Sequence, residues 1–291
     1  MKLARFDADD GPEAGIVVGD HILGLRAATE GEMPGRVVEL IGDADAVREA
    51  AGLADEAARG ETAGERMVPL GEVRLLPPVA RPGKVVCLGL NYSDHAAESG
   101  AEIPDEPVVF CKATTAVIGP GEPIVLPEVS EKVDYEVELA AVIGRPVKNV
   151  SAEEAMDHVA GYTVLCDVSA RDYQHDKPGG QWYLGKSFDT FCPLGPWIVT
   201  REEIPEPHEL DLRCEVSGEV LQSSNTSQMI FRIPEIIAYL SRVFTLEVGD
   251  IVATGTPHGV GAARTPPRFL RSGDNVRCTV EGIGTLENPV R

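Results

Sequence analysis

Three acidic residues alternate with apolar ones in one short segment of the sequence. Asp134, Glu136 and Glu138 are each two residues apart. On a β-strand, side chains two apart point to the same face, so the three carboxylates would line one side of the strand. Carboxylates this close repel one another unless protons or a cation lie between them, and hard oxygen ligands favour Mg²⁺, Mn²⁺ or Ca²⁺ over zinc. The alternative, which the pattern alone favours, is a solvent-facing strand whose acids aid solubility.

A further acid, Asp167, ends the apolar run of residues 161–166. Functional groups collect where strands give way to loops, so Asp167 is a candidate to complete a site of three carboxylates. Arg171 and Gln174 follow closely in the sequence, and their side chains are suited to binding a substrate carboxylate. Ordinary surface polarity is the alternative explanation for both.

A histidine and a glutamate three residues apart form a second candidate pair. His95 and Glu98 would face the same way on a helical turn. A carboxylate beside an imidazole fixes its tautomer and raises its basicity, which is what activating a water molecule requires. An incidental surface pair is the alternative.

Two other segments could meet an anion. Lys186 follows a glycine among aromatic and apolar residues, and a partly buried ammonium group is costly unless it meets an anion. The glycine-rich turn Thr254–Gly259 could offer backbone N–H groups and a hydroxyl.

A mainly β framework must hold these residues. Short β-rich runs bounded by Gly, Pro and Asp occur at Val85–Leu90, Val108–Phe110, Glu136–Ile143, Tyr162–Cys166, Trp197–Val199, Leu212–Val216, Asp250–Ala253 and Val276–Val280. Two helices have clear start signals: a capping box of Ser151 and Glu154, with the helix ending at Gly161, and Pro234 in the first turn of Glu235–Val243. Regular β-α-β alternation is missing, which favours a sheet-on-sheet or rolled β architecture with helices at the edges.

The N-terminal part of the chain is predicted to be a small α+β domain. Short strands are expected at Lys2–Phe6, Gly15–Val18 and Ile22–Leu25, followed by a helical stretch from Arg36 to Arg59. A linker-like segment, Gly60–Gly71, leads to Pro77-Pro78, where we place the boundary between the two domains. We therefore predict two domains, residues 1–76 and 77–291.

Composition limits the class of protein. With 43% apolar and 25% charged residues the chain can bury a core, and its apolar runs are too short for a membrane span. The first residues lack the apolar middle of a signal peptide, so we expect a cytoplasmic protein with six reduced cysteines. A net charge of −21 argues against nucleic acid or an anionic membrane as partner. An anionic substrate would need a local positive centre, which a metal with Lys and Arg would provide.

Taken together, the motifs resemble the fumarylacetoacetate hydrolase superfamily, in particular its shorter bacterial and mitochondrial acylpyruvase-like members. The resemblance runs from about Arg81 to the C-terminus and rests on five ordered motifs: Asn91-Tyr92-x-x-His95-x-x-Glu98, Asp134-Tyr135-Glu136-x-Glu138, Asp167-x-Ser169-x-Arg171-Asp172-x-Gln174, Gly185-Lys186-Ser187-Phe188-Asp189 and Thr254-Gly255-Thr256-Pro257. It implies a mixed β-sandwich roll, a homodimer, and one Mg²⁺ or Mn²⁺ per subunit. The implied ligands are Glu136, Glu138 and Asp167, with Asp134 outside the set.

The resemblance also implies roles for the remaining residues. His95 and Glu98 would form a water-activating pair on a short segment that orders when substrate binds. Lys186 would stabilise the negative charge that develops on the substrate during the reaction. Substrate contacts are implied for Arg171, Gln174 and Thr256.

The chain departs from the family pattern at two places. Asn91 replaces a carboxylate of the vertebrate enzymes, which indicates a substrate other than fumarylacetoacetate, and Lys112-Ala113-Thr114 replaces Lys-Pro-Ser/Thr, which leaves the role of Lys112 open.

The expected reaction is hydrolysis of a carbon–carbon bond in a small 1,3-diketo acid of the acylpyruvate type, through an enolate that the metal stabilises. Decarboxylation of oxaloacetate, or interconversion of enol and keto forms of an oxo acid, is the alternative on the same site. A non-catalytic module with a structural Ca²⁺ is a third alternative.

Overall fold

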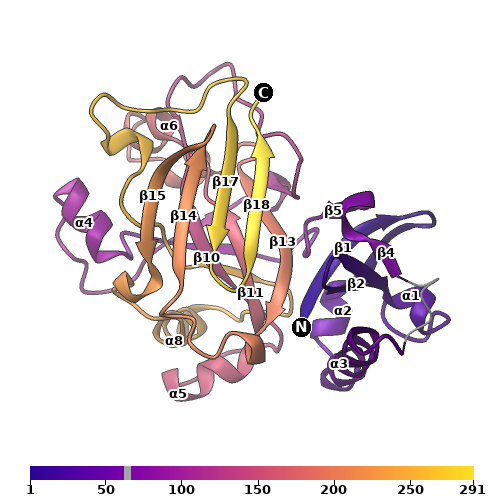
Figure 1. Ribbon diagram of the computed structural model, residues 1–291. Coiled ribbons are helices and arrows are strands. Elements are labelled where there is room, and N and C mark those ends of the chain that lie inside the picture. The colour runs from indigo at the N-terminus through magenta and orange to yellow at the C-terminus, as the bar shows by residue number, and fades with distance from the viewer. Residues whose placement is uncertain (62–66) are drawn as a thin grey trace.

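The computed structural model describes residues 1–61 and 67–291 of the chain. Within these residues, the N-terminal unit (Figure 1) contains the strands β1 (Lys2–Ala8), β2 (Gly11–Val18), β3 (His21–Gly24), β4 (Met67–Pro69) and β5 (Arg74–Leu76) and the helices α1 (Leu25–Ala28), α2 (Val37–Ile41) and α3 (Ala44–Ala58). The predicted linker falls partly on residues 62–66, outside the described residues, and continues into β4. The boundary proposed at residues 76/77 lies at the end of β5 and stays a prediction.

The helical stretch predicted from Arg36 to Arg59 is two helices, because the chain is interrupted at Gly42 and Asp43. The Asp43 carboxylate accepts hydrogen bonds from the amides of Asp45 and Ala46, at 2.9 and 3.2 Å, and so begins a new helix.

A twelve-stranded sheet continues from the N-terminal unit into the rest of the chain, in the order β4-β3-β2-β1-β13-β11-β10-β16-β6-β7, with β5 beside β1 and β8 beside β13. Its remaining strands are β6 (Val85–Gly89), β7 (Val108–Lys112), β8 (Val117–Ile118), β10 (Val137–Ile143), β11 (Val159–Cys166), β13 (Cys192–Thr200) and β16 (Ile251–Ala253). The sheet joins the two parts of the chain through β1 and β13, where Lys2 pairs with Val199.

A second sheet of four strands, in the order β15-β14-β17-β18, lies in front of the large sheet in Figure 1. Its strands are β14 (Asp211–Val216), β15 (Glu219–Asn225), β17 (Asn275–Val280) and β18 (Gly284–Pro289), and a small sheet pairs β9 (Val133–Asp134) with β12 (Ser169–Ala170). The helices of this part are α4 (Ser93–Ser99), α5 (Ala152–Ala155), α6 (Arg171–His175), α7 (Trp182–Lys186) and α8 (Ile233–Val243). The sheet-dominated α+β architecture predicted from the sequence is confirmed.

The helix predicted to run from Ser151 to Gly161 is much shorter than expected. Its capping box is present, but α5 ends at Ala155 and β11 already begins at Val159. Among the helices of the described residues, none has the length and apolar character needed to cross a membrane.

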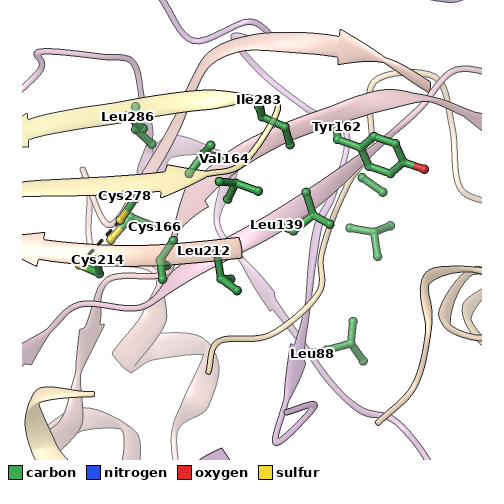
Figure 2. Close-up of a cluster of buried hydrophobic side chains, with 14 of the residues drawn as sticks. Leu88, Leu139, Tyr162, Val164, Cys166, Leu212, Cys214, Cys278, Ile283 and Leu286 are labelled. Carbon is green, nitrogen blue, oxygen red and sulfur yellow. Dashed lines mark hydrogen bonds between the residues drawn. The ribbon is translucent and has the colours of Figure 1, made fainter. Parts of the chain in front are cut away.

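The main hydrophobic core fills the space between the two sheets (Figure 2). Leu139 and Val164 of the large sheet meet Leu212 and Leu286 of the small one, and all are buried. The core also contains three free cysteines, Cys166, Cys214 and Cys278.

Truncating Leu139 tests whether this inter-sheet core holds the fold. Because the side chain is fully buried, Leu139→Ala should lower the free energy of unfolding by roughly 2–5 kcal/mol, through lost burial and the cavity left behind. Urea denaturation measures the change. Leu184→Ala, at a half-exposed position on α7, is the matched control and should change stability by only about 0.5 kcal/mol.

Candidate active site

The three carboxylates predicted to bind a metal meet at one end of the β10–β11 pair. Val137 pairs with Cys166, which brings the residues beside them, Glu136 and Asp167, to the same end of the two strands. One carboxylate oxygen each from Glu136, Glu138 and Asp167 lies within 4.8 Å of the other two, and all three side chains are buried. The solvent-facing alternative for this segment is therefore wrong.

Asp134 lies on neighbouring β9 but has both oxygens committed elsewhere. One oxygen accepts from the amide of Gly261 at 2.7 Å, and the other accepts from the amide of Ala262 at 3.0 Å and from Arg171 Nε at 2.9 Å. Asp134 thus connects Arg171 to the loop after Val260.

Two basic side chains neutralise part of the acidic cluster. Lys186 Nζ donates to Glu136 Oε2 and to Asp167 Oδ2, each at 2.7 Å. Arg171 donates through Nη2 to Glu136 Oε1 at 2.6 Å and through Nη1 to Gln174 Oε1 at 2.9 Å. The lysine and arginine expected near an anionic substrate are therefore present, but they are paired with the acidic side chains, so a positive centre would still need a bound cation.

The surroundings separate the pKa values of the two glutamates. Burial raises the pKa of Glu138 well above its ordinary value, and the charges of Asp167 and Glu136 raise it further. Burial opposes ionisation of Glu136 as well, but Lys186 and Arg171 outweigh it and lower the pKa of Glu136. For Lys186, Asp167 and Glu136 outweigh burial and raise its pKa, so the ammonium group stays charged. A proton on Glu138, or a cation between the three acids, relieves the repulsion.

The chemistry of the donor set suits a divalent cation. All candidate ligand atoms are carboxylate oxygens, the donors that hard cations prefer. Glu138 Oε2 accepts from the amide of Gly255 at 2.8 Å, which orients this carboxylate and leaves its other oxygen available.

His95 and Glu98 lie together on α4, as predicted. His95 Nδ1 is 3.5 Å from Glu98 Oε2, and both Glu98 oxygens accept from the amide of Gly259, at 2.9 and 3.0 Å. Gly259 has a φ of +96°, and a Cβ there would lie 2.1 Å from the carbonyl oxygen of Leu221, so a glycine is required. The turn predicted to bind an anion through its N–H groups therefore binds the carboxylates of Glu98 and Glu138.

One cavity of about 490 Å³ brings most of the predicted residues together. Its lining includes seven of them: His95, Glu98, Glu136, Arg171, Gln174, Lys186 and Thr256. Glu138 and Asp167 do not line it but adjoin Glu136. The rest of the wall is largely apolar and aromatic, with Leu88, Phe110, Trp182 and Val260.

The Thr256 hydroxyl is held by the protein itself. It donates to the carbonyl of Val137 and accepts from Gln222 Nε2, both at 2.9 Å. Its predicted contact with substrate stays a prediction, as do the roles of the other site residues.

Sequence reasoning missed some residues of the site. Gln222 ties Thr256 to β10 by accepting from the amide of Val137 at 3.0 Å, and nothing in its local sequence indicates this. His175 and Trp182 line the cavity with their rings 6.2 Å apart, and burial together with the charges of Arg171 and Lys186 lowers the pKa of His175. Lys112, whose role the sequence left open, ends the apolar strand β7, and a lysine at such a position indicates a buried contact with an acid, here Asp167.

Comparison with known proteins identifies the family. The model of the fumarylacetoacetate (FAA) hydrolase C-terminal domain matches residues 84–291, and the model described as Rv2993c-like, N-terminal, matches residues 1–78. This chain belongs to the fumarylacetoacetate hydrolase family, as the motifs indicated.

Among similar proteins, "Oxaloacetate tautomerase FAHD2A, mitochondrial" from Bos taurus is 46% identical over 294 residues, covering all of this chain and 91% of the relative. The solved fumarylacetoacetate hydrolase from Exiguobacterium antarcticum has a TM-score of 0.84 at 35% identity, covering 100% of this chain and 99% of that one. The maleylpyruvate hydrolase from Sphingobium sp. SYK-6, solved with manganese(II) and pyruvate, has a TM-score of 0.79 at 35% identity, covering 100% and 98%.

These comparisons confirm the predicted fold of the fumarylacetoacetate hydrolase type and an enzyme of this superfamily. The expected cytoplasmic location is wrong: similar proteins from Xenopus laevis, Bos taurus and Homo sapiens carry the word mitochondrial in their names. The start of the sequence, from which that expectation came, was not a sound basis for it.

Proposed function

We propose that this chain is a tautomerase that interconverts the keto and enol forms of oxaloacetate with the help of a divalent cation. The observation that carries the proposal is the cavity, where His95 faces the same space as Glu136 and Lys186. A base, a carboxylate cluster suited to a cation and a charged donor are the groups needed to move a proton between carbon and oxygen. Relatives that span the whole chain and are named oxaloacetate tautomerases support this choice of reaction over hydrolysis.

The reaction moves one proton and breaks no bond between heavy atoms. A proton leaves the carbon next to the oxo group, and the oxo oxygen gains one. When bound, the cation supplies Lewis acidity that lowers the free energy of negative charge on that oxygen. We assign to His95 removal of the carbon-bound proton and its transfer to the oxo oxygen, and the same two transfers in reverse for the return to the keto form. We assign orientation of the imidazole to Glu98, which the Gly259 amide holds with its Oε2 3.5 Å from His95 Nδ1, without a hydrogen bond between the two side chains.

The basic residues keep donors free for the substrate. An ammonium group has three N–H donors, and Lys186 uses two on Glu136 and Asp167, which leaves one for the oxo oxygen. A guanidinium group has five N–H donors, and Arg171 uses three within the protein, which leaves two for a substrate carboxylate. We assign Gln174 and Thr256 to the same substrate-binding group.

We further propose that the cation is Mg²⁺ or Mn²⁺, one per subunit, held by Glu136, Glu138 and Asp167. The oxygen-only donor set supports this, and so does the manganese in the similar maleylpyruvate hydrolase. A homodimer stays a prediction.

Carbon–carbon bond hydrolysis of an acylpyruvate is the second candidate. It is favoured by the similar maleylpyruvate hydrolase and by the apolar part of the cavity wall, which could contact a longer substrate tail. Incubation with oxaloacetate and with an acylpyruvate separates the candidates. The proposed tautomerase changes the enol absorbance of oxaloacetate without new products. A hydrolase instead releases two organic fragments from the acylpyruvate, and a decarboxylase converts oxaloacetate to pyruvate and CO₂.

Removal of the cation should abolish the reaction and lower stability. After dialysis against a chelator, tautomerisation should fall to near the uncatalysed rate and return on addition of Mn²⁺ or Mg²⁺. At a free cation concentration of 100 times the dissociation constant, binding should raise the free energy of unfolding by about 2.7 kcal/mol. Urea denaturation with and without Mn²⁺ measures this. Full activity and unchanged stability after exhaustive chelation would argue against a cation at this site.

A further inference from the structure

Lys112 lies at the end of β7 with its side chain fully buried, and no role in the proposed reaction uses it. Its Nζ donates to Asp167 Oδ1, and it also donates to the carbonyl of Val168 at 3.2 Å. It does not line the cavity. A buried lysine that contacts a candidate metal ligand away from the substrate space requires an explanation.

The two oxygens of Asp167 are held by two different lysines. Lys112 binds Oδ1, whereas Lys186 binds Oδ2 and also Glu136 Oε2. A cation entering between the three acids would compete with Lys186 for these oxygens, because Lys186 already bridges two of them. The contact of Lys112 is with the other oxygen of Asp167, so it can persist when a cation is bound.

The buried charges show why a second lysine matters. Four buried carboxylates, those of Asp134, Glu136, Glu138 and Asp167, share three buried basic groups, those of Lys112, Arg171 and Lys186. Without Lys112 only two basic groups would remain. Uncompensated charges in the interior are strongly unfavourable, and an arriving divalent cation would relieve more repulsion than it does in the native protein.

We propose that Lys112 is a built-in counter-ion that keeps the carboxylate cluster assembled before the cation arrives and thereby weakens cation binding. It is a positioning residue that acts through Asp167 and touches no substrate. The inference rests on the proposed cation site at Glu136, Glu138 and Asp167. By thermodynamic linkage, a group that stabilises the cation-free state more than the cation-bound state must lower the affinity for the cation.

The test is calorimetric titration of Mn²⁺ into the chelator-treated full chain, without substrate. Lys112→Met should bind Mn²⁺ roughly tenfold more tightly than the native protein, since it removes one positive charge near the site. Its cation-free form should unfold at lower urea concentration, and Mn²⁺ should recover most of that loss. Lys112→Gln keeps a hydrogen-bond donor but loses the charge, so it should also bind more tightly and covers the case in which the methionine variant does not fold.

Lys84→Met is the control, because Lys84, although its side chain is 29% exposed, also pairs with a buried aspartate, Asp250, and does not contact the three acids. It should leave Mn²⁺ affinity unchanged. Equal or weaker Mn²⁺ binding in the Lys112 variants would overturn the inference. The hydrogen bonds of Lys112 would then be enough to explain its buried position beside Asp167. If the native protein itself bound no Mn²⁺, the proposed cation site would fail instead, and the two failures are thus distinguishable.

Discussion

Replacing His95 by alanine should lower the rate of oxaloacetate tautomerisation by about 10²–10⁴-fold, the usual contribution of a positioned acid–base group. His95 is the imidazole beside Glu98 on the wall of the cavity, and the proposed mechanism has no other group that takes the carbon-bound proton. Steady-state measurement of enol absorbance gives the rate.

The same variant should still bind Mn²⁺ with unchanged affinity, because His95 is not among the three acidic side chains. His21→Ala is the control, since this histidine lies on β3 in the N-terminal unit, and it should leave the rate unchanged. If His95→Ala turned over oxaloacetate at the native rate, the assignment of the base would be wrong.

Replacing Glu138 by glutamine should reduce Mn²⁺ affinity by more than about 100-fold, because even residues that only support metal ligands typically contribute 10–100-fold. The amide keeps an oxygen that can accept from Gly255, so the backbone contact survives while the charge is lost. Activity at fixed Mn²⁺ should fall in parallel and recover in part at high Mn²⁺ concentration.

Glu13→Gln is a suitable control, because Glu13 is a buried glutamate on β2, away from the three acids. Its Mn²⁺ affinity should equal that of the native chain. Native-like Mn²⁺ binding by Glu138→Gln would remove Glu138 from the ligand set. Since burial and neighbouring charges raise the pKa of Glu138, the substitution should not destabilise the cation-free protein greatly.

The local sequence was enough to predict the β-rich architecture and the proximity of neighbouring candidate site residues. Side-chain alternation placed Glu136 and Glu138 together, and the i, i+3 spacing placed His95 and Glu98 on one helical turn. Both patterns are local, so they do not depend on how distant segments pack.

Contacts between distant segments could not be predicted from the local sequence. Asp167 meets Glu136 only because of the register in which β10 pairs with β11, and Lys112 reaches Asp167 from 55 residues away. Gln222 likewise contacts Val137 across 85 residues. The start of β11 at Val159 was also missed, since α5 ends where the sequence still allowed a helix.

The residue types alone also did not determine which reaction to propose for the site. The same acids, base and lysine can serve hydrolysis, decarboxylation or tautomerisation, because all three pass through negative charge on an oxo oxygen. The names of full-length relatives, rather than the geometry, moved the proposal from hydrolysis to tautomerisation.

The central claim is that the cavity interconverts enol and keto oxaloacetate with the help of a cation at the three acids. The most direct measurement follows enol absorbance of freshly dissolved oxaloacetate with Mn²⁺-loaded protein, while pyruvate is assayed in the same sample. We predict that the approach to keto–enol equilibrium is accelerated and that no pyruvate accumulates beyond the protein-free control. An unchanged approach to equilibrium, or pyruvate formed in step with the absorbance change, would contradict the claim.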